Sequence, residues 1–275
     1  MFTLHCKERI LKIDSPIVMG IINITPDSFY KESRQFNADK ALQKAEQMIE
    51  EGASILDIGG QSTRPNSDLI DDDDEMRRVL PVIDLIRKRF PETFISIDTF
   101  YASVAKQSVD AGADLVNDIS GGKIDGNMLS TVASLHIPFI CMHMKGTPQN
   151  MQQQAVYENV TKEVSVYFDE RIKACNDAGI DDIILDPGFG FSKTIEHNFQ
   201  LLKAFNSFKY FQKPLLLGIS RKSFIYRSLG ITPEESLNGT TVLHTIGLLN
   251  GANIIRTHDV KECMQAIQLI KSYGQ

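Results

Sequence analysis

The sequence predicts one α/β domain, residues 1–275, folded as a single (β/α)8 TIM barrel with an N-terminal β-hairpin plug. Three observations predict this fold. Eight short apolar runs rich in β-forming residues recur along the chain, and longer segments with helical spacing separate them. No linker, low-complexity tract or change in composition divides the 275 residues, and this length suits one such barrel.

The first expected element is a short hairpin over residues 3–13, which could close the N-terminal end of the barrel. Eight predicted strands follow it. Each is apolar at nearly every position, as in a parallel sheet whose two faces are both covered by helices. We expect them at residues 17–24, 54–60, 94–99, 114–120, 138–144, 183–188, 215–220 and 253–258.

The segments between the strands have the spacing of amphipathic helices. The first places Ala41, Ala45 and Met48 on one stripe. Several segments end at glycine, which adopts the left-handed C-cap conformation at low cost. The same alternation of strands and helices also fits an open, doubly wound sheet, which is the alternative fold. We expect helices at residues 39–52, 74–90, 101–111, 157–178, 235–249 and 260–272.

An acidic run at residues 71–75 lies where the second helix is expected to begin. Carboxylates at a helix N-terminus are stabilised by the helix dipole, so this run favours a helix start. A metal site is the alternative interpretation.

Composition narrows the partners and the compartment. The net charge is −6 and the isoelectric point is near 5.6, whereas nucleic acid and anionic membranes require a basic surface. The four cysteines lack metal-binding or CxxC spacing, which is typical of free thiols in a reducing compartment. The N-terminus has no apolar signal segment, and no run reaches the roughly 20 apolar residues of a membrane helix. We therefore expect a cytoplasmic protein with small-molecule substrates and neither nucleic acid nor membrane as partner.

Polar side chains gather where the predicted strands end. In a barrel of this kind, the C-terminal strand ends and the following loops form the active site. Buried polar groups are costly unless they are paired, so such a ring predicts either a ligand site or a self-satisfied polar plug. Its members are Asn23, Asp57, Asp98, Asn117, Asp118, His143, Asp186, Ser220, Arg221, Lys222, Arg256 and His258.

Some members of this ring have simpler explanations when taken singly. Asp98 could cap the helix that follows it. Asn117 could bond to a neighbouring strand end, and His143 could be a core histidine with satisfied hydrogen bonds.

The ring divides by chemical type. Asp98, Asn117 and Asp186 supply acceptors for the amino and N–H edges of a flat heterocycle. The donors suit an anion, because the planar fork of arginine binds two phosphate oxygens at once. A helical segment that begins near Ser223 would add free backbone N–H groups. The donors are Lys222, Arg256 and His258.

Two polar loops, at residues 25–37 and 61–69, are long for βα connections of roughly 2–6 residues. Ser62, Thr63 and Arg64 supply successive donors, and Pro65 stiffens the second loop. Long loops at a barrel mouth are candidate lids, and ordinary surface loops are the alternative.

Eight stretches in chain order resemble the dihydropteroate synthases, a family of pterin-binding barrels. They cover nearly the whole chain, and together they are far more specific than any one of them. They are MGIINITPDSF (19–29), DIGGQSTRP (57–65), SIDT (96–99), NDISGG (117–122), MHMKGTP (142–148), DPGFGFSK (186–193), GISRKSF (218–224) and RTHDV (256–260).

The resemblance implies a role for each matching residue. The pterin would be bound by Asp98, Asn117, Met142, Asp186 and Lys222. The pyrophosphate would be bound by Asn23, Arg64, Arg256 and His258, with Asn23 also binding Mg2+. The p-aminobenzoate would lie against Thr63, Pro65, Phe191, Lys222 and Ser223. The residues implied in catalysis are Lys222, Arg256, His258 and Arg64.

The implied enzyme is a transferase of folate biosynthesis. It would join 6-hydroxymethyl-7,8-dihydropterin pyrophosphate to p-aminobenzoate, giving 7,8-dihydropteroate and pyrophosphate by an SN1-like path. The resemblance also implies competition by sulfonamides at the p-aminobenzoate site and a homodimer formed through barrel helices.

The sequence departs from the family pattern in the first loop. The family usually continues PDSF with Ser-Asp-Gly-Gly, whereas this chain has Tyr30, Lys31, Glu32 and Ser33. The role of the family's loop aspartate is therefore unassigned, and Glu32 or Asp27 could supply it.

Two other functions share part of the pattern. A methyltetrahydrofolate–corrinoid methyltransferase would have the same pterin anchors, but it would not need the STRP loop or the cations Arg256 and His258. A non-catalytic pterin-binding paralogue is left open by the departure at Lys31.

Overall fold

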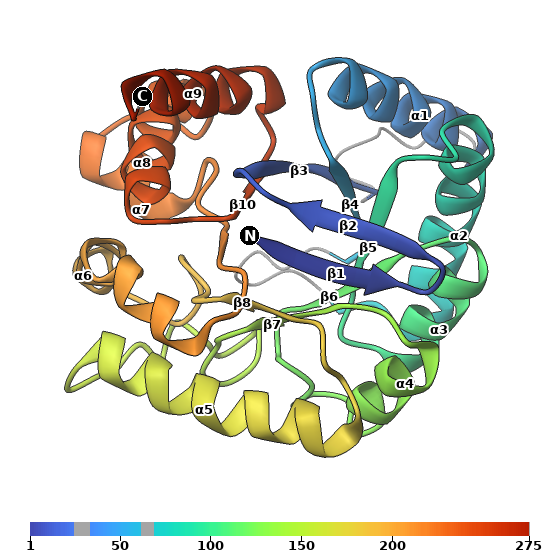
Figure 1. Ribbon diagram of the computed structural model, residues 1–275, viewed down its shortest axis with the longest axis horizontal. Coiled ribbons are helices and arrows are strands. Elements are labelled where there is room, and N and C mark those ends of the chain that lie inside the picture. Colours follow the sequence, from blue (N-terminus) through green and yellow to red (C-terminus); the bar gives the residue numbers. More distant parts are fainter. Residues whose placement is uncertain (25–33, 62–68, 275) are drawn as a thin grey trace.

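The computed structural model describes residues 1–24, 34–61 and 69–274, and it contains one parallel barrel ringed by helices (Figure 1). A separate antiparallel hairpin precedes the barrel and consists of β1 (Phe2–Cys6) and β2 (Arg9–Ile13). The barrel strands are β3 (Ile17–Asn23), β4 (Ile55–Gly59), β5 (Phe94–Asp98), β6 (Leu115–Asp118), β7 (Phe139–Met142), β8 (Ile183–Asp186), β9 (Leu216–Leu217) and β10 (Ile254–Thr257).

The eight strands follow one another around the barrel in chain order, with β10 lying between β9 and β3. A bridge between Leu185 and Leu215 joins β8 to the start of β9 and closes the ring. A doubly wound sheet would instead reverse its strand order and stay open. The barrel prediction is therefore confirmed, and the open-sheet alternative is wrong.

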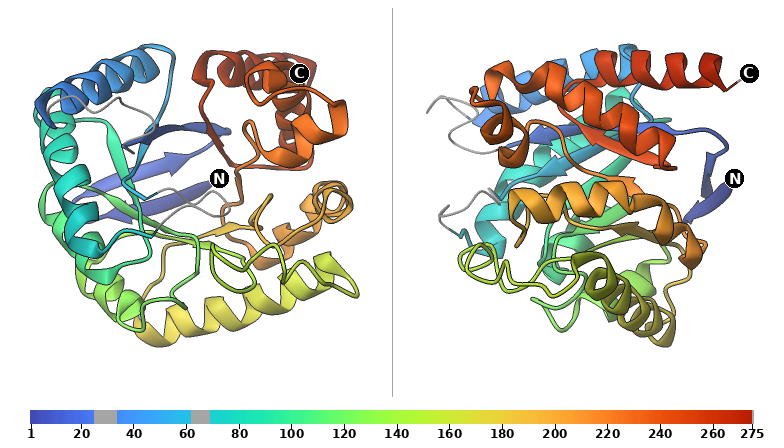
Figure 2. Two further views of the ribbon diagram at one scale, coloured as in Figure 1. Left: turned by 180° about the vertical axis from the view of Figure 1, so that it is seen from behind. Right: turned by 90° about the vertical axis from the view of Figure 1, so that its left-hand side faces the viewer.

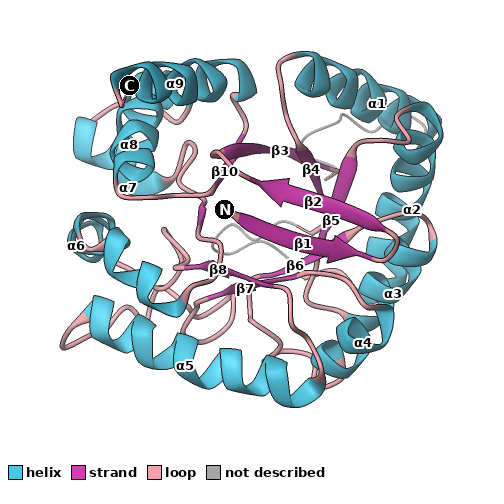
Figure 3. Ribbon diagram, viewed as in Figure 1, coloured by secondary structure: helices cyan, strands magenta, loops and turns pink. Residues whose placement is uncertain are grey.

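Helices cover the outside of the barrel, as the colouring by secondary structure in Figure 3 makes plain. The first loop is shorter than predicted, because the first helix already begins at Arg34. Two short 3-10 turns at Phe205–Phe211 and Glu234–Ser236 complete the connections. The helices are α1 (Arg34–Glu50), α2 (Asp72–Arg89), α3 (Ala102–Asp110), α4 (Met128–Leu135), α5 (Val160–Ala178), α6 (Ile195–Lys203), α7 (Ser223–Leu229), α8 (Leu237–Leu249) and α9 (Val260–Tyr273).

Three of these helices, α4, α6 and α7, lie outside the six predicted ranges, although a helical segment that begins near Ser223 was expected at α7. They have eight, nine and seven residues, so each presents only about two turns of amphipathic spacing.

The acidic run at residues 71–75 lies at the start of a helix, as the simpler interpretation of this run predicts. Asp71 caps α2 by accepting a hydrogen bond from the Asp74 N–H at 2.7 Å.

The barrel interior is built in layers, because alternate residues of each strand point inward. The layer at the N-terminal end of the barrel is apolar and packs against the hairpin residues Leu4, Cys6, Leu11 and Ile13. The hairpin thus plugs this end, as predicted, and it crosses the front of the barrel in Figure 1. The layer consists of Met19, Ile55, Leu115, Ile140, Ile184, Leu216 and Ile254.

The polar layers lie toward the other end of the same strands. Two residues beyond the apolar layer stand Asp57, Asn117, Asp186 and Arg256, and Asp98 lies one layer further up. The strand register places Gly59 beside Asp98 and Asp98 beside Asn117. The period of two along each strand therefore directs the acceptors and the arginine into one interior space.

No helix in the described part of the chain is long and apolar enough to cross a membrane.

Candidate active site

A small cavity opens at the C-terminal end of the barrel. Seven of the side chains predicted for the site line it, from five strands and the two loops that follow β8 and β9. Its apolar walls join a cluster in which Ile119 and Met142 pack with Phe100, Met144 and Met151. The cavity is lined by Asp98, Asn117, Ile119, Met142, Asp186, Phe191, Gly218, Lys222 and Arg256.

Arg256 bridges two buried carboxylates. Its Nε donates to Asp57 Oδ2 and its Nη2 donates to Asp98 Oδ2, both at 2.6 Å. The side chain of Asp57 is fully buried and that of Asp98 is 14% exposed. Asp98 therefore binds an arginine on another strand, and the alternative interpretation, that it caps the following helix, is wrong: the cap of α3 is Tyr101.

A hydrogen bond to Asp57 fixes the orientation of the Asn117 side-chain amide. Its Nδ2 donates to Asp57 Oδ2 at 3.1 Å, and a carboxylate can only accept there. The carbonyl oxygen of Asn117 is consequently the group left for a ligand in the cavity that this residue lines. Asp57, which sequence reasoning placed in the ring but not in the site, thus orients both Asn117 and Arg256.

Asp186 and Lys222 form the opposite wall. Asp186 Oδ1 accepts from the Gly188 N–H at 2.7 Å. The Lys222 ammonium donates to the Phe189 carbonyl oxygen and lies 4.6 Å from the centre of the Phe191 ring. Lys222 is also the N-cap residue of α7, so the predicted helix start at Ser223 is confirmed.

Burial shifts the proton equilibria of these groups. It raises the pKa of Asp98 to about 7, while Arg256 opposes the shift. It also raises the pKa of Asp186, where Lys222 opposes it. Burial lowers the pKa of Lys222 to about 8. The charges of Asp98 and Lys222 therefore change near neutral pH, as is common for groups at functional sites.

Three predicted site residues lie near the mouth but do not line this cavity. Asn23 is the half-buried last residue of β3, next to Gly59. His258 follows β10, and its Nδ1 lies 3.0 Å from Ser220 Oγ. Ser223 begins α7. They surround the cavity rather than form it.

Three members of the predicted ring point away from the interior. Asp118 alternates with Asn117 and binds the backbone of its own loop, accepting from the Ser120 and Gly122 N–H groups. His143 alternates with Met142 and lies against Tyr167 of α5, 4.8 Å between ring centres. Arg221 pairs with Asp259 at 2.7 Å. Their inclusion in the ring was wrong: Asp118 and His143 face away from the interior because neighbours along a strand lie on opposite faces, and Arg221 lies in the turn after β9, where Asp259 binds it.

The two predicted lid loops fall mostly outside the described residues. Thr63, Arg64 and Pro65, and also Lys31 and Glu32, lie there. Their predicted roles stay predictions.

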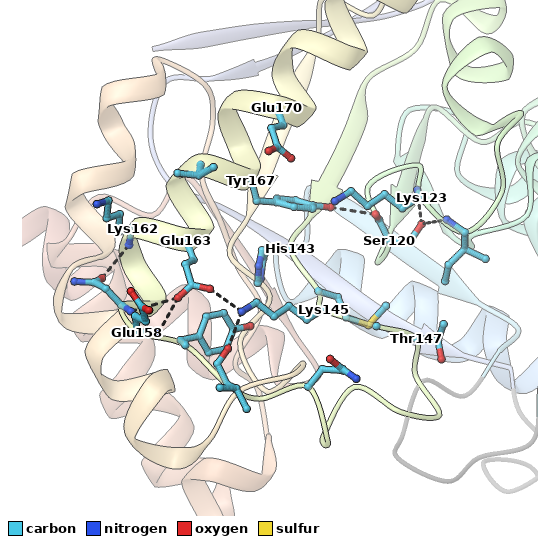
Figure 4. A pocket seen from close by; sticks show the side chains of 18 residues that line it. Ser120, Lys123, His143, Lys145, Thr147, Glu158, Lys162, Glu163, Tyr167 and Glu170 are labelled. Atoms are coloured by element: carbon cyan, nitrogen blue, oxygen red, sulfur yellow. Dashed lines mark hydrogen bonds and ion pairs between the residues drawn. The ribbon is translucent and has the colours of Figure 1, made fainter.

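A wide groove lies beside the cavity, between α5 and residues 144–159, and Figure 4 shows it from close by. Its three lysines and three glutamates balance in charge, and some are already paired, such as Lys145 with Glu163 at 2.6 Å. Because the charges of its lining balance, this groove lacks the excess of positive charge that a pyrophosphate site would need. The lysines are Lys123, Lys145 and Lys162, and the glutamates are Glu158, Glu163 and Glu170.

Within the described ranges, no three His, Cys, Asp or Glu side chains converge as a metal cluster. Asn23, the predicted Mg2+ ligand, is not a residue of these four types. It offers a single amide oxygen at the end of β3. Sequence reasoning also missed Lys193, which is 4% exposed directly behind the loop that carries Phe191. Its only signal in the sequence is its place at the end of DPGFGFSK.

The chain is similar in sequence and in fold to known pterin-binding enzymes. Residues 19–258 match the family described as pterin binding enzyme. The chain is 41% identical to the dihydropteroate synthase of Escherichia coli (strain K12), covering 95% of this chain and 93% of that one. Its fold matches a Yersinia pestis dihydropteroate synthase with a sulfonamide drug (TM-score 0.93, 38% identity, 99% of both chains). It also matches one from Xanthomonas albilineans in complex with 7,8-dihydropteroate (TM-score 0.90, 34% identity, 99% of both chains).

Proposed function

We propose, from the premise that the chain belongs to the pterin-binding enzyme family, that it catalyses the dihydropteroate synthase reaction. It joins 6-hydroxymethyl-7,8-dihydropterin pyrophosphate to p-aminobenzoate and releases pyrophosphate. The observation that carries this is the cavity that the acceptors Asp98, Asn117 and Asp186 line together with the donor Lys222. A dihydropterin ring offers several N–H donors on one edge and a carbonyl that suits a lysine donor.

The reaction breaks the C–O bond to pyrophosphate and forms a C–N bond to the amine of p-aminobenzoate. Pyrophosphate leaves with the bonding electron pair, and the amine loses one proton. In an SN1-like path the intermediate is a methylene cation conjugated with the pterin ring. Asp98 and Asp186, whose side chains line the cavity, are the carboxyl groups that we assign to stabilising positive charge on that ring.

Cationic groups beside the cavity favour departure of the pyrophosphate. Arg256 and Lys222 line the cavity, and His258 lies at the mouth next to Ser220. Oriented cations that meet charge as it develops are among the larger sources of rate enhancement. We assign Arg256 and His258 to the pyrophosphate, Lys222 to the pterin and p-aminobenzoate, and Phe191 to the p-aminobenzoate.

Mg2+ is proposed as the metal that accompanies pyrophosphate. Mg2+ is usually held by one or two protein oxygens together with substrate phosphates and water. The side-chain oxygen of Asn23, at the end of β3, fits that donor set. When bound there, the ion would neutralise charge on the leaving group.

The proposed function is tested with purified protein, the pterin pyrophosphate, p-aminobenzoate and Mg2+, by following pyrophosphate release and dihydropteroate formation. Both products are expected in equal amounts. Omission of p-aminobenzoate serves as the control. Absence of dihydropteroate under conditions in which the Escherichia coli relative is active would overturn the proposal and leave a non-catalytic pterin-binding protein. By analogy with the Yersinia pestis relative, sulfonamides are expected to compete with p-aminobenzoate.

The acid side of the pH profile is expected to depend on Asp98. The pKa of Asp98 is raised by burial to about 7, so below that pH its carboxyl is protonated and loses acceptor strength toward the pterin. The kcat/KM for the pterin pyrophosphate should fall as the pH drops through 7, since this ratio reports groups of the free enzyme. Asp98→Asn should lower activity at neutral pH and flatten this limb. An unchanged limb in the variant would assign the titration to another group.

We also propose a homodimer, formed through the apolar face of α8. Val242, Ile246 and Leu249 recur at helical spacing and are 50%, 37% and 57% exposed, an arrangement that marks association surfaces. Light scattering should give twice the chain mass of 30.8 kDa. Ile246→Asp should shift the mass toward the monomer, and a monomeric unaltered protein would contradict the proposal.

The cytoplasm is the proposed location. The four cysteines, Cys6, Cys141, Cys175 and Cys263, are all buried free thiols. Free thiols of this kind are usual in a reducing compartment.

A further inference from the structure

Lys193 is a buried lysine on the far side of the loop that carries Phe191. Its side chain lies between β7 and the loop of residues 188–192, and the residue is 4% exposed. Its Nζ contacts three acceptors: the Gly188 carbonyl oxygen at 2.9 Å, the Phe191 carbonyl oxygen at 3.1 Å and His143 Nδ1 at 3.0 Å. None of these groups has a place in the reaction described above.

The three contacts of Lys193 fit both protonation states of its amine. An ammonium group would donate to the two carbonyl oxygens and to His143 Nδ1, whereas a neutral amine would donate to the two carbonyl oxygens and accept from the Nδ1–H tautomer of His143. Burial lowers the pKa of Lys193 well below its ordinary value, while Asp186 opposes the shift. Lys193 donates to both carbonyl oxygens in either state, so its contacts with the loop do not depend on its charge.

The loop that Lys193 holds has a backbone with little tolerance for change. Gly188 and Gly190 have φ of +70° and +79°. A Cβ on Gly188 would lie 2.0 Å from the His143 carbonyl oxygen, and a Cβ on Gly190 would lie 2.9 Å from the Lys222 side chain. The left-handed conformation at both glycines lets the loop present the Phe189 carbonyl oxygen to Lys222 and the Gly188 and Phe191 carbonyl oxygens to Lys193, so the loop conformation and the lysine contacts are linked.

The same loop connects both substrate sites. Asp186, the pterin anchor, precedes it and accepts from the Gly188 N–H. Phe191 follows and places its ring 4.6 Å from the Lys222 ammonium at the cavity wall. Lys222 binds the Phe189 carbonyl oxygen from the cavity side, while Lys193 binds the Gly188 and Phe191 carbonyl oxygens from behind. Each of these two carbonyls has one further donor, the Phe191 N–H at 3.2 Å and the Ser192 hydroxyl at 2.8 Å. Loss of Lys193 would therefore remove the one group that ties the two carbonyls to each other and to His143.

We propose that Lys193 is a positioning residue for the p-aminobenzoate site: it fixes the 188–192 loop so that the Phe191 ring forms the wall of that site. This inference rests on the proposed function and assigns to Lys193 a role in the affinity for the second substrate. The pterin anchors Asp98 and Asn117 lie on other strands and do not depend on the loop.

The test compares Lys193→Met, which keeps the length of the side chain and removes its N–H donors, with Lys203→Met at an exposed lysine on α6. In Lys193→Met the KM for p-aminobenzoate should rise roughly tenfold or more, and the KM for the pterin pyrophosphate should change less than about threefold. Lys203→Met should change neither. A merely structural role would lower the folded fraction and leave both KM values of the remaining enzyme unchanged, which would overturn the proposal.

A double-mutant cycle with Phe191→Ala tests the route of the effect. If Lys193 acts through Phe191, adding Lys193→Met to Phe191→Ala should change the KM for p-aminobenzoate less than about twofold. Additive effects of the two substitutions would overturn the proposal.

Lys193→Gln provides a second variant in case Lys193→Met does not fold. Its amide keeps two N–H donors for the two carbonyls, and it should raise the same KM by a smaller factor. Unaltered protein that makes dihydropteroate while both Lys193 variants keep a normal KM would refute this inference alone. Unaltered protein without activity would refute the proposed function instead.

Discussion

Replacement of Arg256 with alanine is expected to lower kcat/KM roughly a thousandfold, equivalent to about 4 kcal/mol of transition-state stabilisation. It removes a cation that lines the cavity and that we propose to act on the pyrophosphate. It also removes the group that bridges Asp57 and Asp98, and truncating one partner of a buried ion pair commonly costs about 3–5 kcal/mol. The melting temperature should therefore fall by roughly 10 °C.

Two controls separate these effects. Arg87→Ala removes a half-buried arginine that pairs with Asp114 at the opposite end of the barrel, so it should lower the melting temperature and leave turnover per folded molecule unchanged. Arg256→Ala combined with Asp57→Asn should recover part of the melting temperature without recovering activity. If Arg256→Ala keeps more than about a tenth of the kcat/KM, Arg256 does not act on the pyrophosphate.

Replacement of Lys222 with methionine is expected to reduce turnover by a similar factor, roughly a thousandfold, but with little loss of stability. Burial lowers the pKa of Lys222 to about 8, below the ordinary lysine value. A folded-state pKa below the unfolded one means that the charged lysine destabilises the fold at neutral pH. Methionine keeps the apolar stem over Phe191 and removes that charge, so the melting temperature should stay within about 5 °C of the original.

Lys145→Met is the matched control for this variant. Lys145 lies in the neighbouring groove, pairs with Glu163 at 2.6 Å and stands 3.7 Å from the centre of the Tyr157 ring. Because such partly exposed pairs contribute about 1 kcal/mol or less, its removal should change turnover less than about twofold. Normal turnover in Lys222→Met, measured as pyrophosphate release, would rule out Lys222 as a pterin ligand.

Much of the fold could be predicted from the chain, because eight continuous apolar runs leave few arrangements other than a barrel. The predicted strand at residues 215–220 shows the limit. Regular pairing stops at Leu217, since Gly218 already lines the cavity and the chain turns to bring in Lys222. The short helices α4 and α6 were missed for the same kind of reason, as two turns give too little periodicity to detect.

The site was predictable where residue type and strand period agree. Asp98, Asn117, Asp186 and Arg256 all point inward at strand ends and meet in one cavity. His143 failed the prediction because proximity in sequence to a strand end does not say which face of the strand it occupies. The bridge from Arg256 to both Asp57 and Asp98 joins residues 199 and 158 positions apart, and no local pattern encodes such a contact.

The position of the chain ends has a practical consequence. The hairpin seals one end of the barrel, and α9 runs back toward that same end after leaving the mouth at Val260, so both termini lie far from the catalytic opening (Figure 2). An affinity tag, a fluorescent fusion or a tether to a sensor chip at either terminus would leave substrate entry unobstructed. Immobilised protein should therefore be suitable for measuring sulfonamide binding directly.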